Sequence, residues 1–355
     1  MDRHGRAAED LSRTEGQGLD ILLPKLRGLI LEARRKAATA INSLQVATNF
    51  EIGRLIVEQE QQGSERAAYG ASLIQELSIR LSGEFGKGFS PVNLSLMRKF
   101  YLLYRDRMGA AIFQTPSEIS GAESALSWSH HVLLLSVKDQ VERDFYEIEA
   151  GRSTWSVAEL RRQMESCLYE RLALSRDKEG IARLALEGQL VSTPGDMLKE
   201  PYVLEFLGLR ESEKYSEAEL EGAIIARLEE FLLELGKGFL FEARQRRFTF
   251  DEEHFFVDLV FYNRLLRCYV LIDLKLGKVS HQDLGQMQMY VNYFDQFVKT
   301  EAEERTIGII LCKRKNDAIV KLTLPPDANI HAKEYQLYLP SKEVLRDKLL
   351  EWTQK

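Results

Sequence analysis

The sequence predicts a two-domain protein, an all-helical N-terminal half followed by a domain of the α+β or α/β class. Two observations predict it. Apolar residues recur at helical spacing over 20–107 and 127–169, whereas aromatic and β-branched runs separated by short polar turns follow residue 238. A chain of 355 residues with 45% hydrophobic composition can also bury more than one core. We expect a disordered tail at 1–18, a helical domain at 19–190 and a second domain at 191–355.

Composition excludes several classes of protein. The three cysteines lie far apart and form no CxxC or Cys/His spacing, so neither a disulfide framework nor a zinc site is expected. No run of about 18 apolar residues occurs, and the first residues lack the apolar core of a signal peptide. The sequence therefore predicts a soluble, cytoplasmic protein without a membrane partner. The formal net charge of -6 means that any nucleic-acid contact comes from local basic patches.

The helical half contains a candidate helix-turn-helix over 77–104. Ser90 and Pro91 open its second helix after a turn through three glycines, Gly83, Gly86 and Gly88. Arg98 and Lys99 are expected to be exposed on that second helix, where they would contact nucleic acid in a major groove. An ordinary helical hairpin explains the same pattern, and the sequence leaves both interpretations open.

The second domain is predicted to follow the order α-β-β-β-α-β. Ser216 and Glu219 form a capping box at the start of one helix over 215–236. A three-strand meander is expected next, then a helix, two further strands and a short final helix. The predicted ranges are 239–250, 254–262 and 268–276 for the meander, 280–297 for the helix, 306–312 and 334–339 for the strands, and the chain after Ser341 for the last helix.

Charged residues interrupt two of the predicted strands. Asp273 and Lys275 stand two apart in an otherwise apolar run, so both point to one face, and Asp258 stands alone among six apolar neighbours. A short turn joins the two strands, so they are expected to be antiparallel neighbours that bring Asp258 close to Asp273. Burying such charges is costly, and two adjacent carboxylates repel unless a cation lies between them. A divalent metal ion would supply that cation.

The helix over 215–236 supplies a third acid. Glu221 falls inside its apolar stripe, whereas Glu229, Glu230 and Glu234 fall outside it. Glu217 lies near the same face but in the first turn, where the helix dipole alone explains an acidic residue. We therefore expect Glu221, rather than Glu217, to face the site.

The helix over 280–297 carries Gln282, Gln286 and Tyr290 at four-residue intervals on one face. For Gln282 a solvated polar stripe is the favoured interpretation. For Gln286 and Tyr290 we favour a place beside the metal.

These residues resemble a known superfamily. Asp258, the segment 272–275 (Ile-Asp-Leu-Lys) and the helix acid resemble the PD-(D/E)xK nucleases, and Gln286 to Tyr290 is similar to the QxxxY motif of their RecB-like branch. The wider pattern over about 20–345 resembles the YhcG-like bacterial proteins, as in the segments 155–160, 231–239, 258–264, 285–287 and 307–312. Two positions depart from the pattern: Val257 stands where the motif name has Pro, and Asp273 where Glu is frequent.

The resemblance implies a winged-helix-like DNA-binding domain before a restriction-endonuclease-like nuclease domain. It implies that Asp258 and Asp273, with Glu221 directly or through water, hold Mg²⁺ or Mn²⁺. Lys275 would orient the attacking water, and Gln286 and Tyr290 would position the strand. Basic residues on the first strand of the meander would hold backbone phosphates beside Gln245, although an exposed sheet edge protected by charge explains them equally well; they are Arg244, Arg246 and Arg247.

The expected activity is metal-dependent hydrolysis of DNA, with RNA not excluded. A homodimer that cuts two strands is suggested only by analogy. Two other hypotheses compete with a nuclease. In one, the chain is a nucleic-acid-binding or assembly protein whose nuclease fold does not cut. In the other, Asp258, Asp273 and Lys275 form a purely structural ion-pair network, against which the excess of carboxylate counts.

Overall fold

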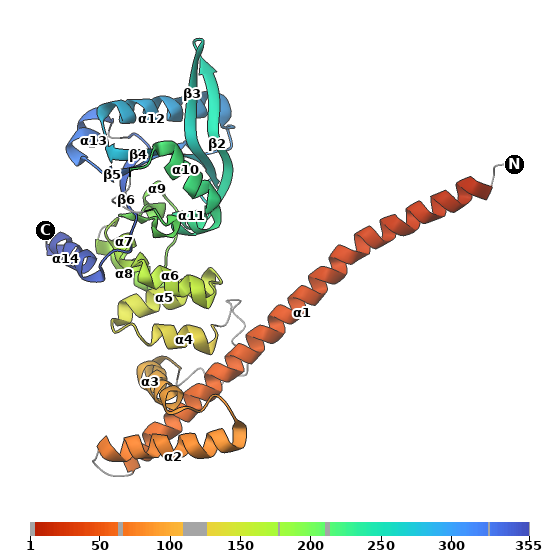
Figure 1. The fold of residues 1–355 in the computed structure, drawn as a ribbon, viewed down its shortest axis with the longest axis vertical. Helices are drawn as coiled ribbons and strands as arrows, with labels where there is room; N and C mark the ends of the chain where they lie inside the picture. Colours follow the sequence, from red (N-terminus) through yellow and green to blue (C-terminus); the bar gives the residue numbers. More distant parts are fainter. Residues whose placement is uncertain are drawn as a thin grey trace. The chain divides into compact units, whose positions relative to one another are not determined.

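The computed structural model describes residues 4–62, 67–108, 126–176, 178–209, 214–325 and 327–354 (Figure 1). The chain divides into two compact units, Met1–Arg143 with Glu149–Val157, and Asp144–Ile148 with Ala158–Lys355. This division falls well before residue 190, where the sequence places the domain boundary. The boundary at residue 190 stays a prediction.

Helices make up the regular structure described before residue 200. They are α1 (His4–Gln62), α2 (Ala67–Phe85), α3 (Pro91–Met108), α4 (Trp128–Leu134), α5 (Gln140–Arg152), α6 (Val157–Glu165), α7 (Leu168–Ala173), α8 (Lys178–Glu187) and α9 (Pro194–Met197). The predicted tail at 1–18 is corrected from His4 onward, because α1 already includes these residues. Ala7, Ala8 and Leu11 favour a helix, and each of the three glycines before residue 19 costs it only about 1 kcal/mol.

The predicted helix-turn-helix appears as α2, a turn and α3. Gly86 and Gly88 form the turn with φ values of 82° and 122°, a backbone conformation that favours glycine, whereas Gly83 belongs to α2. The hydroxyl of Ser90 accepts a hydrogen bond from the backbone amide of Asn93 at 3.2 Å, which caps α3. The apolar face of α3 is buried against α1 through a cluster that includes Phe50, Leu94, Met97 and Phe100. No strand occurs among the described residues before Tyr202, so the wing of a winged helix stays a prediction.

The second unit contains a six-stranded mixed sheet in the order β1-β6-β5-β4-β3-β2. β2, β3 and β4 are antiparallel neighbours, and β4, β5, β6 and β1 are parallel. The strands are β1 (Tyr202–Val203), β2 (Phe239–Phe250), β3 (Glu253–Asn263), β4 (Cys268–Lys278), β5 (Ile307–Arg314) and β6 (Ile330–Gln336). The helical elements are η1 (Glu205–Leu207), α10 (Glu217–Ala226), α11 (Leu228–Leu235), α12 (His281–Tyr293), η2 (Phe294–Val298), α13 (Asp317–Thr323) and α14 (Lys342–Gln354).

The predicted α-β-β-β-α-β order is confirmed, with two corrections. The helix predicted over 215–236 is interrupted at Arg227, whose φ of -124° and ψ of 41° are not helical, so it becomes α10 and α11. The last strand is β6 at 330–336 rather than 334–339, because its pairing with β5 begins at Ile330 opposite Gly308. The capping box at Ser216 is present, with the Glu219 amide 3.2 Å from the Ser216 hydroxyl.

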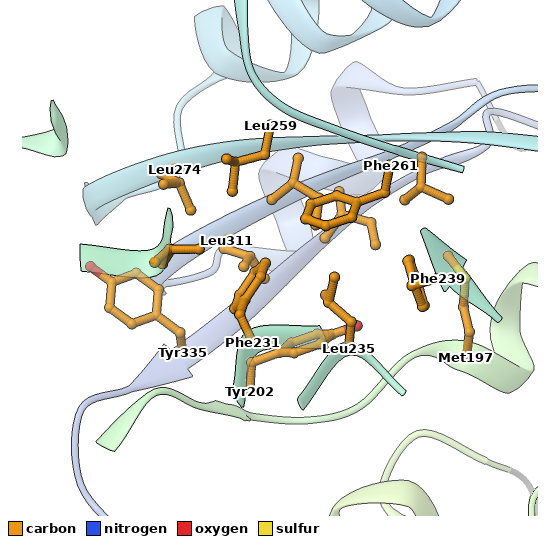
Figure 2. Close-up of a cluster of buried hydrophobic side chains, with 14 of the residues drawn as sticks. Met197, Tyr202, Phe231, Leu235, Phe239, Leu259, Phe261, Leu274, Leu311 and Tyr335 are labelled. Atoms are coloured by element: carbon orange, nitrogen blue, oxygen red, sulfur yellow. The ribbon is translucent and has the colours of Figure 1, made fainter. Parts of the chain in front are cut away.

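Helices cover both faces of the sheet. On one face α10 and α11 pack on β3, β4 and β5 through Leu220, Ile224, Phe231 and the cluster drawn in Figure 2. On the other face α12 packs through Leu284, Met287 and Tyr290. Because side chains alternate along a strand, Leu271 on the α12 face places Asp273 and Lys275 on that face too. The α12 side of the sheet therefore contributes to the site, which α10 also reaches through Glu217 and Glu221.

Among the helices that the structure describes, none is long and apolar enough to cross a membrane. Cys167, Cys268 and Cys312 are all buried, and none of the three forms a disulfide.

Candidate functional site

The site is organised around two carboxylates on neighbouring strands. Leu259 of β3 pairs with Ile272 of β4, so Asp258 and Asp273 occupy the next facing positions along the antiparallel ladder. The backbone amide of Leu274 donates to Asp258 Oδ2 at 2.9 Å, which fixes the Asp258 side chain against β4. Asp273 is only 3% exposed. The expected proximity of the two acids follows from this register.

Lys275 lies beside the same pair. Its Nζ is 2.9 Å from Asp273 Oδ2 and 3.6 Å from Glu217 Oε2. Glu217, which the sequence interpretation assigned to the helix dipole alone, therefore also contacts the lysine of the site. The signal for it was its place one turn before Glu221 on the same side of α10.

The two acids are electrostatically coupled. Burial and the neighbouring Asp258 charge together raise the pKa of Asp273 to about 7, although Lys275 acts in the opposite direction. Burial acts to lower the pKa of Lys275, but the Asp273 charge outweighs it and the pKa is raised. Lys275 therefore stays protonated. Its single positive charge does not neutralise both carboxylates, so the site still favours binding of a cation.

Glu221 reaches the site through Gln245. The Gln245 amide donates to Asp258 Oδ1 at 3.1 Å and also to Glu221 Oε2, so one amide bridges the acids of α10 and β3. Gln245 has a φ of +46°, a left-handed conformation that is strained for a residue with a side chain. Arg244 Nε is 3.9 Å from Glu221 Oε1 and its side chain is 58% exposed. Glu221 itself is buried, as its place in the apolar stripe predicts.

Gln286 and Tyr290 stand on the α12 side of this site. The Gln286 amide donates to the Tyr290 hydroxyl, so the two residues form one unit across a helical turn. Burial raises the pKa of Tyr290, Gln286 lowers it, and the charges of Asp273 and Asp258 raise it further, which places the phenol within the field of both carboxylates. Gln282 is exposed, as the solvated polar stripe predicts.

The remaining predicted residues have partners of their own. Arg247 lies 2.8 Å from the His254 ring across the β2–β3 pair, and Arg246 pairs with Glu242. β2 is an edge strand of the sheet. Its arginines are therefore also consistent with the alternative that charged side chains protect an exposed sheet edge.

In the first unit, Arg98 Nε is 2.6 Å from Glu60 Oε2, and Lys99 Nζ is 2.6 Å from the Leu135 carbonyl. Arg98 is thus less free than the sequence suggests, and its role stays a prediction with that of Lys99.

The fit of a metal ion rests on the acids themselves. Within the described ranges, no group of three or more His, Cys, Asp or Glu side chains is arranged to hold an ion jointly. Asp258 and Asp273 remain as a pair of hard oxygen ligands, and Asp273 Oδ2 is buried, with the Lys275 ammonium 2.9 Å away. Glu221 is held by Gln245 instead. The two-carboxylate part of the predicted set fits a divalent ion, and Glu221 would join it through water or after the Gln245 amide turns away.

Sequence reasoning missed a second group of charges. Glu234 of α11, placed outside the apolar stripe, is fully buried and pairs with the fully buried Arg171 of α7. The Lys199 ammonium donates to the backbone carbonyl of Glu234, and the Val203 amide donates to its carboxylate at 2.9 Å. This network is structural, since none of its contacts reaches the site on β3 and β4.

Comparisons with known proteins identify a nuclease family. A family model described as the YhcG PDDEXK nuclease domain matches residues 195–350, and a model of the DUF1016 N-terminal domain matches residues 25–171. The chain is 39% identical over 363 aligned positions to "Putative nuclease YhcG" of Escherichia coli (strain K12), with 96% of each chain covered.

Two solved structures resemble part of the chain. A repair endonuclease from Pyrococcus abyssi is 19% identical, with 37% of this chain and 50% of that chain covered and a TM-score of 0.24. An EndoMS–dsDNA complex is 16% identical, with 38% and 51% covered and a TM-score of 0.26. Likenesses this low do not bear on function.

Proposed function

Because the chain belongs to the YhcG family and carries its PDDEXK nuclease domain, we propose that it hydrolyses phosphodiester bonds of DNA with a divalent metal ion, Mg²⁺ or Mn²⁺. The observation that carries the proposal is the pair Asp258 and Asp273, which face one another on β3 and β4 with Lys275 beside them. Lys275 lies close to three acids, Glu217, Asp258 and Asp273, and a purely structural network would balance its charges more closely.

Asp258 and Asp273 are the residues proposed to hold the ion, with the Leu274 carbonyl and with Glu221 directly or through water. A bound Mg²⁺ ion would polarise the scissile phosphate and lower the pKa of a water molecule. The Leu274 amide keeps Asp258 pointed toward Asp273, so that both carboxylates are presented on one side of the sheet.

Lys275 is proposed to orient the attacking water and to offset negative charge that develops on the phosphate. Asp273 and Glu217 hold its ammonium group in place and keep it protonated. A side chain fixed from two sides loses little conformational freedom when the substrate arrives, which favours catalysis.

Contacts to the nucleic acid are proposed on both sides of the acids. Gln286 and Tyr290 of α12 would position the nucleic-acid strand. On β2, Arg244, Gln245 and Arg247 would bind its backbone phosphates. In the helical half, Arg98 and Lys99 are proposed to contact the DNA backbone. Each of these has an intramolecular partner, so binding would exchange that partner for a phosphate.

A non-cleaving binding protein is the second candidate. The observation in its favour is that side chains of the protein already bind the acids. Gln245 donates hydrogen bonds to Glu221 and Asp258, and Lys275 forms an ion pair with Asp273. Asp258, Asp273 and Lys275 are nevertheless all present, whereas a protein that has lost cleavage is free to lose them.

A cleavage assay on the full chain separates the two candidates. Labelled single-stranded, double-stranded and branched DNA, and RNA, are incubated with Mg²⁺, Mn²⁺ or EDTA. We expect cleavage of DNA that requires metal and disappears in Asp273→Ala. Binding of DNA by wild type without cleavage in any metal would leave the binding protein as the answer, and preferential cleavage of RNA would change the substrate.

A further inference from the structure

A groove of aromatic residues runs beside the site, between the far end of β2 and α12 with η2. Its volume is about 360 Å³, which lies near the lower end of the range for small-ligand sites. Its lining carries no charged side chain and consists of Phe248, Phe250, Gly285, Gln288, Met289, Asn292, Tyr293, Gln296 and Phe297. The proposed chemistry uses none of these residues.

A series of ring contacts connects the groove to Tyr290 of the site. Phe248 lies parallel to Tyr293, with 4.0 Å between ring centroids and 20° between planes, and Phe297 follows at 5.2 Å from Tyr293. On the other side, Phe248 meets Tyr290 edge to face at 5.5 Å. The phenol that faces Asp258 and Asp273 is therefore one ring away from the groove.

Two phenylalanines in this groove are exposed to a degree that packing does not explain. Phe250 is 55% exposed and Phe297 is 61% exposed. Single apolar side chains are often exposed, whereas two rings that line one groove form an apolar patch of the kind that contacts a partner.

A row of amides runs along the same groove. Gln288 and Asn292 share one face of α12, and Gln296 continues the row on η2. The Gln288 amide donates to Asn292 Oδ1 at 2.9 Å, which leaves its own carbonyl oxygen, Oε1, buried and without a hydrogen-bond partner in the described structure. A buried acceptor without a partner costs free energy, which a ligand that enters the groove with a hydrogen-bond donor can recover.

We propose that this groove binds unstacked nucleobases of a single-stranded segment adjacent to the scissile bond. The inference rests on the proposed nuclease function and names its substrate class. Stacked rings offer faces for a flat base, Gln288 Oε1 offers an acceptor for an exocyclic amine, and the uncharged lining suits a neutral ligand. In a duplex the base faces are already stacked, so the groove selects DNA with unpaired positions.

The test measures binding without cleavage, in Ca²⁺ or EDTA, by fluorescence anisotropy with the full chain. The probes are a single-stranded oligonucleotide, the same strand with abasic positions, and a duplex. The variants are Phe250→Ala and Phe297→Ala, whose exposed rings contribute little to folding. Tyr338→Ala, a 48% exposed tyrosine of the same unit outside the groove, is the matched control.

We expect Phe250→Ala and Phe297→Ala to weaken single-strand binding roughly 5- to 100-fold, since one stacked base contributes about 1–3 kcal/mol. Duplex and abasic-strand binding should change less than about twofold, and Tyr338→Ala should resemble wild type. Equal losses on all probes, or none, would overturn the proposal. If Phe297→Ala instead converts a dimer into a monomer in sedimentation without changing DNA binding, the groove is a self-association surface. Metal-dependent cleavage of duplex DNA without any single-strand preference would leave the nuclease intact and refute only the groove.

Discussion

Replacing Arg171 with methionine is expected to destabilise the second unit by about 3–5 kcal/mol, the cost typical of breaking a buried ion pair. Arg171 and Glu234 both have fully buried side chains, so the substitution leaves a carboxylate without its main counter-charge in a dry environment. Arg171 also donates to the Ser166 carbonyl at 2.7 Å and to the Pro201 carbonyl at 3.1 Å, and both acceptors lose their donor. Glu234→Leu has the mirror effect, because it leaves the charges of Arg171 and Lys199 uncompensated.

The double variant Arg171→Met/Glu234→Leu distinguishes the cost of leaving one buried charge without its partner from the cost of lost packing. With both charges removed, its cost should be smaller than the sum of the two single costs by about 2–3 kcal/mol, the upper range for directly coupled residues. Arg267 and Glu304 form the matched control pair, since they lie 3.2 Å apart with side chains 64% and 65% exposed. Arg267→Met is expected to cost at most about 1 kcal/mol.

The assay is thermal unfolding, supported by hydrogen exchange of the β3 and β4 amides so that the second unit is followed specifically. For domains of about 150–250 residues each kcal/mol corresponds to about 2–4 °C, so Arg171→Met should lower the Tm by about 6–20 °C. Single and double variants whose costs simply add would refute the coupling. An Arg171→Met shift no larger than that of Arg267→Met would refute the burial argument itself.

Three further predictions follow from particular contacts. Burial acts to raise the pKa of Glu234, but its cationic partners outweigh burial and lower the pKa. The charged Glu234 therefore stabilises the fold above the unfolded-state pKa, and this contribution is lost as the pH falls through the folded-state pKa. The stability of Glu234→Leu should accordingly fall less steeply than that of wild type as the pH is lowered. Gln245→Gly should maintain or raise the Tm, because glycine adopts the φ of +46° without strain. Cleavage should fall, because Glu221 and Asp258 lose the amide that donates to both. A parallel fall in Tm and activity would contradict this prediction. Gly308→Ala should cost about 1–3 kcal/mol and reduce cleavage, since its Cβ would lie 2.7 Å from Met287 Cγ and displace α12; unchanged stability in urea would refute it.

The part of the fold that the sequence predicts best is local. The meander of β2 to β4 and the cap at Ser216 are confirmed because each depends on neighbouring residues: alternation of side chains, short turns, and a hydroxyl three residues from an amide. The pairing of Asp258 with Asp273 follows from the same short turn. The break at Arg227 has no such signal, since neither glycine nor proline stands there.

What the sequence could not predict depends on contacts between distant residues. Glu234 looks like a solvent-facing acid on a helix, and only its partner 63 residues earlier, Arg171, makes its burial favourable. Likewise, Gln245 reads as a phosphate contact on a strand, and its role as a bridge follows from a left-handed backbone that no local pattern announces. β6 begins earlier than its apolar residues suggest because β5 and β1 set its pairing.

The central claim is that the excess of carboxylate on β3 and β4 is a place for a divalent cation, and metal-dependent stability tests it most directly. The Tm of wild type, Asp273→Asn and Asp258→Asn is measured in EDTA and across a Mg²⁺ titration, with Asp295→Asn as a control acid away from the pair. Ligand that binds only the folded state should raise the wild-type Tm with concentration. We expect that rise in wild type and Asp295→Asn and its loss in both site variants. A wild-type Tm that ignores Mg²⁺, or a rise that survives both substitutions, would contradict the account.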